Sequence, residues 1–382
     1  MTRQPHAVLL MGDTLNLGGT EGQFVEVACG LDRSRWRLEV ACIRAEGPLR
    51  ARLAEAGIEP WSCNGTSFTS PRLIVTILGL ARRLRALRLE LVHSFDFYSN
   101  LLVIPAARIA RVPVIIASQR DLGELRPRHQ HRIHRAMLRL ATHVMVNSSA
   151  VADRLSRSHA ARSGRLSVIH NGVDLSRFAP ASPPPPASDT LLVGALASLR
   201  AYKGLRELVE AAAEVKRSAG HVRFVIWGEG PLRAELEGRI RALGLSDTVR
   251  LPGATREPEA ALRQCQIFVH PSLSEASSNV VLEAMATGLP VVATTAGGTP
   301  ALVQHGQSGL LVPPGSPAAL AGAVLSLVAD RGFAAQLGAA ARLRAVTEFG
   351  MDRMLQRLEA LYLHALGVDP QPSVGVGAVA RS

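Results

Sequence analysis

Short apolar runs and longer amphipathic segments alternate along the whole chain. The apolar runs are bounded by Gly, Pro, Asn or charged residues, which is typical of strands buried on both faces of a parallel sheet. They lie at 6–11, 38–43, 89–92, 112–118, 143–147, 166–169, 191–196, 224–227, 249–251, 267–269, 290–293 and 309–312. Helical periodicity is found at 23–31, 49–56, 71–90, 205–216, 232–243, 280–286 and 351–366. This alternation predicts an α/β fold with doubly wound, Rossmann-like sheets.

Length and local composition divide the pattern into two domains. At 382 residues the chain is long enough for two separate cores. Four consecutive prolines at 183–186 cannot lie inside a helix or a strand, so residues 180–188 are predicted to be a stiff linker. The predicted parts are a first domain at 1–179, a second domain at 189–349, a final helix at 350–368 and a disordered tail at 369–382.

Composition is that of a globular protein, with 47% apolar and 19% charged residues. The first apolar run is too short for a secretion signal, and no run approaches the roughly 18 apolar residues that a membrane span needs. The four cysteines, Cys29, Cys42, Cys63 and Cys265, have neither metal nor redox spacing, which fits a reducing compartment. We therefore expect a cytoplasmic protein.

The net charge of +12 is concentrated in the first half of the chain. Residues 1–180 contain 25 arginines against 14 acidic residues, whereas the remainder is almost balanced. A general preference for Arg over Lys, of which the chain has two, raises the count without explaining the asymmetry. A basic domain indicates nucleic acid or an anionic membrane surface as a partner. Aromatic residues make up only 4% and offer little for base stacking, so we expect no nucleic acid.

The segment 71–90 combines this charge with helical periodicity. Leu73, Ile77, Leu80, Leu84 and Leu87 are predicted to form one apolar face, and arginines crowd the second half of the segment. A basic amphipathic helix indicates an anionic membrane surface. The commoner explanation is a helix that faces the core and has a solvated basic side.

The segment 126–140 contains three closely spaced histidines, His129, His131 and His134. Their spacing does not bring all three rings onto one helical face, and the arginines between them would repel a cation. We therefore expect no metal site here. An anionic acceptor or a lipid headgroup is the better partner, and a solvated run of charge is the alternative.

The most informative stretch is 270–298, HPSLSEASSNVVLEAMATGLPVVATTAGG, in which two predicted strands frame a helix. Ser277, Ser278 and Asn279 are N-cap candidates, and Val280 follows them. The free N–H groups of such a helix start can bind a diphosphate. Glu275 precedes the helix and Glu283 lies about one turn inside it. Carboxylates accept hydrogen bonds from the vicinal hydroxyls of a sugar or a ribose. From their spacing alone, an exposed loop and a surface salt bridge are the commoner explanation.

Two cations follow the predicted strand 191–196. Arg200 and Lys203 stand beside Gly204 and a predicted helix start. Arg binds phosphate bidentately and Lys binds it as a point charge, so the pair is suited to a diphosphate and to the charge that develops when it leaves. Surface charge at a helix end is the alternative. Gly228, in the glycine-rich loop after 224–227, leaves room for a nucleotide base.

The stretch SEASSNVVLEAMATGLPVVAT resembles the donor-site signature of the retaining glycosyltransferases of family 4, which have the GT-B fold. Similar segments follow in the same order over about residues 6–365, and the second half is the stronger part. The resemblance implies two Rossmann-like domains facing across a cleft, the second binding a nucleotide-diphosphate sugar and the first binding the acceptor. It also implies retention of anomeric configuration without a metal ion or other cofactor. Consistently, the chain has no Asp-x-Asp motif.

The resemblance also implies individual roles. Arg200 and Lys203 would hold the diphosphate, Glu275 the hydroxyls of the donor sugar and Glu283 the ribose. His93, at the end of the strand 89–92, and the Gly18-Gly19 loop would contact the sugar from the first domain. One position departs from the pattern, because Ala276 stands where the family most often has Gly. A methyl group there leaves the identity of the donor open.

The predicted function is therefore transfer of a sugar to a saccharide or lipid-linked acceptor, in bacterial cell-surface polysaccharide or glycolipid synthesis. A basic first domain suits a peripheral position on the inner face of the membrane. A nucleotide-sugar epimerase of the same fold is one alternative, against which the Glu-x7-Glu spacing argues. A non-catalytic scaffold is another, and it would be expected to lose Arg200, Lys203 or Glu275, all of which are present.

Overall fold

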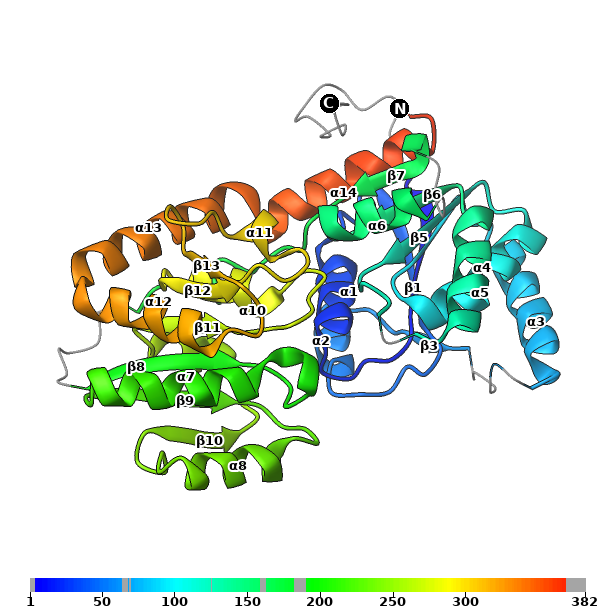
Figure 1. Cartoon of the computed structure of the whole chain (residues 1–382). Helices are drawn as coiled ribbons and strands as arrows, with labels where there is room; N and C mark the ends of the chain where they lie inside the picture. The colour runs from blue at the N-terminus through cyan, green and yellow to red at the C-terminus, as the bar shows by residue number, and fades with distance from the viewer. Residues whose placement is uncertain are drawn as a thin grey trace. The chain divides into compact units, whose positions relative to one another are not determined.

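The computed structural model describes residues 4–63, 68, 70–124, 126–158, 163–181 and 190–368 (Figure 1). The chain divides into two compact units. The first unit comprises the chain up to Asn171 together with the part from Asp352, and the second unit comprises Gly172–Met351. Residues 182–189, most of the predicted linker, and the predicted tail at 369–382 lie outside the described residues.

The boundary between the units therefore lies about eight residues before the one predicted at 179/180. The physical reason is that the segment before the prolines already packs on the second unit. The Val173 N–H donates to the Phe349 carbonyl at 2.8 Å, and Phe178 is buried in the core of that unit. The proline-rich segment marks where the chain cannot form a helix or a strand. It does not show at which residue the chain stops packing on the first unit and begins to pack on the second.

The first unit is built on a seven-stranded parallel sheet in the order β3-β2-β1-β4-β5-β6-β7. Its strands are β1 (His6–Gly12), β2 (Trp36–Cys42), β3 (Trp61–Ser62), β4 (Leu91–Ser94), β5 (Val114–Gln119), β6 (His143–Val146) and β7 (Leu166–Val168). The central strand β1 is buried on both faces, since every residue from Ala7 to Met11 is at most 3% exposed. This burial explains its uninterrupted apolar sequence.

Helices cover the sheet of the first unit. They are α1 (Gly19–Gly30), α2 (Arg50–Glu55), α3 (Arg72–Ala86), α4 (Phe97–Ala110), α5 (Arg128–Leu140), α6 (Ser149–Arg157), the 3-10 turn η1 (Ser163–Arg165) and α14 (Met351–Ala365). The pattern of apolar positions did not predict α4, which contains Pro105. Asp96 nonetheless starts this helix with a capping box, in which its carboxylate accepts from the Ser99 N–H.

The final helix α14 packs on the first unit. Tyr362 is fully buried and meets the ring of Trp36 edge to face at 5.4 Å. Glu359 pairs with Arg35 at 2.9 Å, and Leu355 lies over Gly30 so closely that a Cβ there would meet its methyl group. The last helix of the chain thus completes the core that the first strand begins.

The second unit has a six-stranded parallel sheet in the order β10-β9-β8-β11-β12-β13. Its strands are β8 (Leu191–Leu196), β9 (Val222–Trp227), β10 (Val249–Gly253), β11 (Ile267–His270), β12 (Val291–Thr294) and β13 (Leu310–Val312). Its helices are η2 (Ala201–Lys203), α7 (Leu205–Ser218), α8 (Arg233–Ala242), α9 (Pro258–Arg263), α10 (Asn279–Ala286), α11 (Thr299–Leu302), α12 (Pro317–Ala329) and α13 (Arg331–Glu348).

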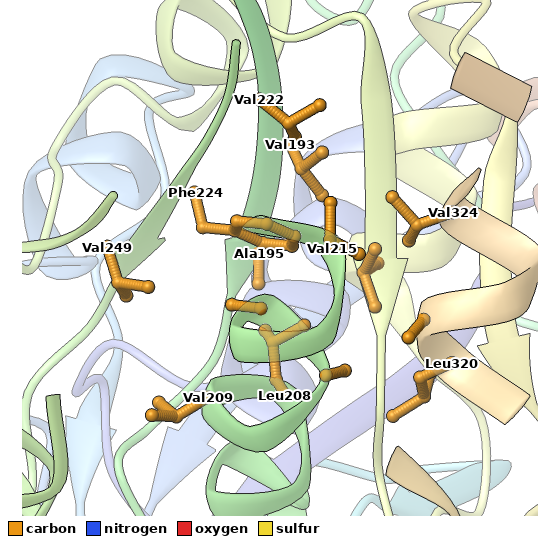
Figure 2. Close-up of a cluster of buried hydrophobic side chains, with 14 of the residues drawn as sticks. Val193, Ala195, Leu208, Val209, Val215, Val222, Phe224, Val249, Leu320 and Val324 are labelled. Atoms are coloured by element: carbon orange, nitrogen blue, oxygen red, sulfur yellow. The ribbon is translucent and has the colours of Figure 1, made fainter. Parts of the chain in front are cut away.

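The core of the second unit fills both faces of this sheet. Figure 2 shows one face, where Phe224 of β9 and Val193 of β8 meet Leu208 of α7 and Leu320 of α12. On the other face α10 and α13 pack through residues such as Met285. Each fully buried side chain of this size contributes about 1.5–3 kcal/mol of hydrophobic stabilisation.

In the described part of the chain, no single helix is long and apolar enough to cross a membrane. The helices α12 and α13 together meet that length and composition, but they meet at a bend of 105°.

In both sheets the winding reverses at one point. The reversal lies between β1 and β4 in the first unit and between β8 and β11 in the second. Crossover connections leave in opposite directions there, so the carboxyl ends of these two strands border an open crevice where ligands of such sheets bind.

Gly204 allows the loops on the two sides of the second crevice to touch. Its φ of +65° is unfavourable for other residues, and a Cβ would lie 1.9 Å from the carbonyl oxygen of Pro271. The N–H of Leu273 also donates to the Tyr202 carbonyl at 2.8 Å. The loop after β8 is thereby fixed to the loop after β11.

We predict that Gly204→Ala lowers the stability of the second unit by at least about 2 kcal/mol, because both the backbone angle and the contact with Pro271 oppose a methyl group. Gly322→Ala is the matched control. This exposed glycine inside α12 has nothing within 4 Å of its Cβ position, so the substitution should add about 1 kcal/mol. Urea denaturation measures both, and equal effects would contradict the assignment.

Candidate functional site

Lys203 and Glu275 meet at the reversal point of the second unit. Lys203 ends η2, in the connection after β8, and Glu275 lies in the loop between β11 and α10. The Lys203 Nζ donates to Glu275 Oε2 at 2.6 Å. The Glu275 carbonyl accepts from the N–H of Gly298 at 3.0 Å, which fixes the loop that presents the carboxylate. The two residues that the sequence assigned to one ligand are thus in direct contact.

Electrostatics keep this carboxylate ionised. Burial alone would raise the pKa of Glu275. The His270 imidazole and the Lys203 ammonium together lower it by more than this rise, so the net pKa is about 2. The side chains of Lys203 and Glu275 are only 17% and 13% exposed. His270 Nε2 lies 3.3 Å from Glu275 Oε2, and burial lowers the pKa of this histidine although the carboxylate opposes the shift. Sequence reasoning missed His270, although it ends a buried strand at the crevice.

The start of α10 borders the same loop. Ser278 caps the helix by accepting from the N–H of Val281 at 3.4 Å, and Asn279 and Val280 form its first turn. Ala276, the departure from the family pattern, is buried. These residues lie where the sequence predicted them.

Several hydroxyl groups near this loop have no partner. Within the described residues, the buried hydroxyls of Ser272, Ser277 and Thr299 make no hydrogen bond. Thr299 opens α11, next to the Gly298 that binds the Glu275 loop. Because buried polar groups are normally satisfied, these hydroxyls indicate a position for a polar ligand. Among them, sequence reasoning considered only Ser277, and only as a helix cap.

Glu283 has a different environment from Glu275. Burial raises its pKa to about 7, the charge of Arg177 opposes this rise, and that of Glu259 adds to it. Arg177 is itself paired with Glu259 at 2.9 Å. The Glu283 carboxyl has no hydrogen bond or ion pair with another described residue, and its raised pKa makes it easier to protonate than an ordinary glutamate.

Arg200 and Gly228 occupy neighbouring loops. Arg200 is exposed, and its guanidinium has no ion pair among the described residues. Gly228 has a φ of +158°, and a Cβ there would lie 1.8 Å from the carbonyl oxygen of Ala197. The Leu199 N–H donates to the Glu229 carbonyl at 2.9 Å, which joins the loops after β8 and β9. The Arg200 guanidinium thus lies on the loop after β8. This loop packs closely against the loop after β9 because Gly228 has no Cβ.

The structure does not support the role expected of His93. This residue lies one position inside β4, is 0% exposed, and has both ring nitrogens engaged. Nδ1 lies 2.6 Å from the Tyr362 hydroxyl and Nε2 lies 2.7 Å from the Ser118 hydroxyl. Burial also lowers its pKa well below the usual value. His93 therefore joins α14 to the sheet instead of presenting a nitrogen to a sugar.

The glycine-rich loop of the first unit lies at its crevice. Gly18 and Gly19 are exposed at the start of α1, which begins four residues earlier than predicted. Asp13 and Asp96 follow the two strands that border this crevice. Burial raises the pKa of Asp96 to about 7, and the charge of Asp13 adds to this rise. Burial also raises the pKa of Asp13, which the charge of Arg44 opposes. Sequence reasoning missed both acids, because each follows an apolar run singly.

The three histidines of α5 do not gather. His134 is buried, with its ring nitrogens 3.2 Å from Asn100 Nδ2 and 3.1 Å from a guanidinium nitrogen of Arg126. Burial lowers its pKa to about 3. In the parts of the chain that the structure describes, no three His, Cys, Asp or Glu side chains are grouped to hold a metal ion.

Comparison with known proteins assigns the family. A model described as Glycosyltransferase Family 4 matches residues 17–177, and one described as Glycosyl transferases group 1 matches residues 188–330. The chain is 32% identical over 302 residues to the D-inositol 3-phosphate glycosyltransferase of Nocardiopsis dassonvillei, a match that covers 72% of this chain and 70% of that protein. The chain belongs to the group 1 glycosyltransferases of family 4. The resemblance seen in the sequence is thereby confirmed.

One further relative of this glycosyltransferase is matched over a smaller part of its length. The colanic acid biosynthesis glycosyltransferase WcaL of Escherichia coli is 33% identical over 214 residues, which cover 54% of this chain and 51% of that protein. The match thus spans about half the length of that relative.

Solved structures establish the fold of the glycosyltransferase. HepE of Anabaena, crystallised with UDP, matches with a TM-score of 0.82 at 23% identity, covering 94% of this chain and 100% of that one. Sucrose-phosphate synthase of Thermosynechococcus elongatus matches with a TM-score of 0.78 at 21% identity, covering 95% and 100%. The predicted GT-B fold, with two Rossmann-like sheets, is confirmed.

We predict that Glu283 makes the free enzyme less stable as pH rises. Its folded pKa, about 7, exceeds the unfolded value of 4.5, so the folded state binds more protons between these values and loses stability as pH increases through them. Glu283→Gln should remove this loss, and the variant should exceed wild type at pH 8 by on the order of 2 kcal/mol.

Urea denaturation between pH 5 and pH 8 measures this effect. Glu237→Gln, which alters an exposed carboxylate on α8, is the control and should follow the wild-type profile. Parallel profiles for wild type and Glu283→Gln would show that the carboxyl is not held in its neutral form.

Proposed function

We propose that this glycosyltransferase moves a sugar from a nucleotide-diphosphate sugar to an acceptor, with retention of configuration and without a metal ion. The observation that carries the proposal is the contact between Lys203 and Glu275 at the crevice of the second unit. A cation and an ionised carboxylate side by side are suited to a ligand with a charged diphosphate and a hydroxylated sugar.

The donor would be held by residues from three loops. Lys203 and the free guanidinium of Arg200 would bind the diphosphate, helped by the N–H groups at the start of α10. Glu275, released from Lys203, would accept hydrogen bonds from the sugar hydroxyls. Glu283 would bind the ribose. The positive charges take the place that a metal ion would otherwise have, since they stabilise the departing diphosphate.

Retention follows from one order of bond changes. The bond between the anomeric carbon and the diphosphate oxygen breaks, and the acceptor oxygen bonds to the same face of that carbon. The acceptor proton passes to the departing phosphate. No protein nucleophile is required, and the cations keep the leaving group on the face where the acceptor arrives.

The comparisons support a nucleotide sugar and a cell-surface product. HepE of Anabaena, which shares the fold, has been crystallised with UDP-glucose. WcaL of Escherichia coli is named for colanic acid biosynthesis, and AmsK of Erwinia amylovora for amylovoran biosynthesis. We therefore place the reaction in cell-surface polysaccharide or glycolipid synthesis in the cytoplasm, with a saccharide or lipid-linked acceptor.

The two lysines of the chain provide a matched test of the donor site. Lys203 lies at the crevice, and Lys216 pairs with Asp247 at 2.6 Å at the far end of α7. In the presence of a chelator, one of UDP, GDP or ADP should raise the melting temperature of wild type and of Lys216→Met, because binding to the folded state stabilises it. Lys203→Met should lose the shift. An equal shift in Lys203→Met would place the nucleotide elsewhere.

The product distinguishes transfer from the alternatives. Proton NMR of the sugar released or transferred should show the donor's anomeric configuration. A new sugar nucleotide formed without acceptor would indicate an epimerase instead. Nucleotide binding with no turnover of any sugar nucleotide, even to water, would favour a scaffold.

We also propose that the first unit binds an anionic membrane surface through α3, α4 and α5, which lie side by side (Figure 1). These helices contain nine arginines and no acidic residue. Seven of the exposed large hydrophobic side chains belong to them: Ile74, Val75, Leu78, Tyr98, Ile109, Ile133 and Leu140. Positive charge interleaved with exposed aliphatic groups fits anionic headgroups above a hydrocarbon layer.

The orientation of α3 differs in part from the prediction. The structure buries Leu80 and Leu84 as expected, but Leu73 and Ile77 are only half-buried. Ile74 and Val75, at 65% and 70% exposed, face outward beyond the predicted apolar stripe. A helix that only covered the core would not need a second apolar face.

Vesicle sedimentation tests this location. Wild type should bind vesicles of phosphatidylcholine with phosphatidylglycerol more tightly than phosphatidylcholine alone, and Ile74→Ser/Val75→Ser should weaken this binding by roughly tenfold. Leu343→Ser/Val346→Ser, which alters exposed apolar residues of α13, is the control. Binding that depends on salt but not on Ile74 and Val75 would indicate an acidic protein or polymer as the partner.

A further inference from the structure

Arg120 stands directly after β5, at the carboxyl edge of the first unit's sheet. We propose that Arg120 anchors an anionic group of the acceptor, a phosphate or a carboxylate. This inference rests on the proposed function, since it gives the acceptor a chemical feature that the family assignment does not supply.

The guanidinium of Arg120 is largely unpartnered. Its Nη2 donates to Asn171 Oδ1 at 2.8 Å, and its carbon lies 5.3 Å from the centre of the Phe95 ring. Its Nε is buried and makes no hydrogen bond, and no carboxylate among the described residues pairs with it. Arginine has five N–H donors, so most of the binding capacity of this side chain is unused.

Burial of this charge is unfavourable in the free protein. Desolvation lowers the pKa of Arg120 to about 10, and the only charge that opposes this shift belongs to Tyr362. Tyr362 is itself buried, which raises its pKa well above the usual value, so its hydroxyl stays neutral and cannot compensate the cation. A buried cation without an anion costs stability that an uncharged residue of similar size would not. A ligand anion would compensate it.

The neighbouring Arg126 shows what a structural arginine looks like in the same unit. Its guanidinium pairs with Asp121 at 2.6 Å, contacts His134 at 3.1 Å and lies over the Phe97 ring at 4.5 Å. Both terminal nitrogens and the flat face of that guanidinium have a partner within the protein. The contrast indicates that Arg120 is not placed to hold the fold together.

A second polar group without a partner adjoins Arg120. Asn147 follows β6, the next strand of the sheet, and is 2% exposed. Its Nδ2 donates to the Arg120 carbonyl at 3.4 Å, whereas its Oδ1 is buried and accepts no hydrogen bond from the described residues. The guanidinium offers donors for an anion, and the amide oxygen offers an acceptor for a hydroxyl. Together they fit a hydroxylated acceptor that carries a negative charge.

Anion-dependent stabilisation tests the assignment. Because phosphate also suits the donor site, the background is the full-length variant Arg200→Gln/Lys203→Met. Inorganic phosphate and acetate are titrated against it at constant ionic strength while the melting temperature is recorded. The melting temperature should rise, and adding Arg120→Gln should abolish the rise, whereas adding Arg126→Gln should preserve it.

The two probes distinguish the kinds of anion. A rise with phosphate alone supports a phosphorylated acceptor, a rise with acetate alone supports a carboxylate, and a rise with both supports either. The same rise in the presence of Arg120→Gln, or no rise with either probe, overturns the proposal.

The stability of the free protein is the second measurement. Arg120→Gln should melt at or above the wild-type temperature because it removes an uncompensated charge, and Arg126→Gln should melt lower because it breaks an ion pair. A fall for Arg120→Gln as large as that for Arg126→Gln would make Arg120 structural and overturn the proposal.

A nucleoside diphosphate tests the proposed donor site independently of the proposed role of Arg120. Arg120→Gln should keep the melting shift that a nucleoside diphosphate produces in wild type. If wild type shows no such shift, the proposed donor site fails, while the phosphate and acetate titrations still decide whether Arg120 binds an anion.

Discussion

The proposed donor site depends most on one ion pair, between Lys203 and Glu275. The two residues are 72 positions apart and meet because the sheet of the second unit reverses its winding between β8 and β11. No crossover helix covers that gap, so loops from both strands can present side chains to it. Burying such a pair is costly, and apolar residues of similar size often serve stability as well or better. The pair fits the proposed role of two ligand contacts, which would hold each other until a donor binds.

The same physics gives the two carboxylates of the donor stretch opposite properties. Glu275 sits against an ammonium group, and its pKa falls to about 2, so it is an acceptor at any physiological pH. Glu283 has no hydrogen bond or ion pair with another residue that the structure describes, and burial raises its pKa to about 7. Such separation of pKa values by environment is characteristic of functional sites. Arg120 in the first unit follows the same logic, because it is a half-buried charge that pairs with no carboxylate among the described residues.

Much of the fold was predictable because strands buried on both faces leave a strong apolar signal. The positions of Lys203, Glu275 and Ser278 were predictable because each lies close to a strand end or a helix start. Less local features were not predictable. The helix α4 contains Pro105, and its start is fixed by Asp96. The helix α12 is apolar on all sides. Neither helix therefore shows a clear amphipathic pattern.

His93 shows the limit most clearly. A histidine near a strand end can face a crevice or the core, and a partner 269 residues away, Tyr362, decides between them. The outward apolar face of α3 and the unpaired state of Arg120 likewise depend on neighbours that sequence spacing does not reveal.

NMR of the enzyme labelled with 15N-lysine tests most directly whether Lys203 exchanges Glu275 for a donor diphosphate. The chain has two lysines and so gives two side-chain signals, which Lys216→Arg assigns. A nucleoside diphosphate should shift the Lys203 signal and leave the Lys216 signal in place. A Lys203 signal unchanged at saturating nucleotide would contradict the proposed exchange.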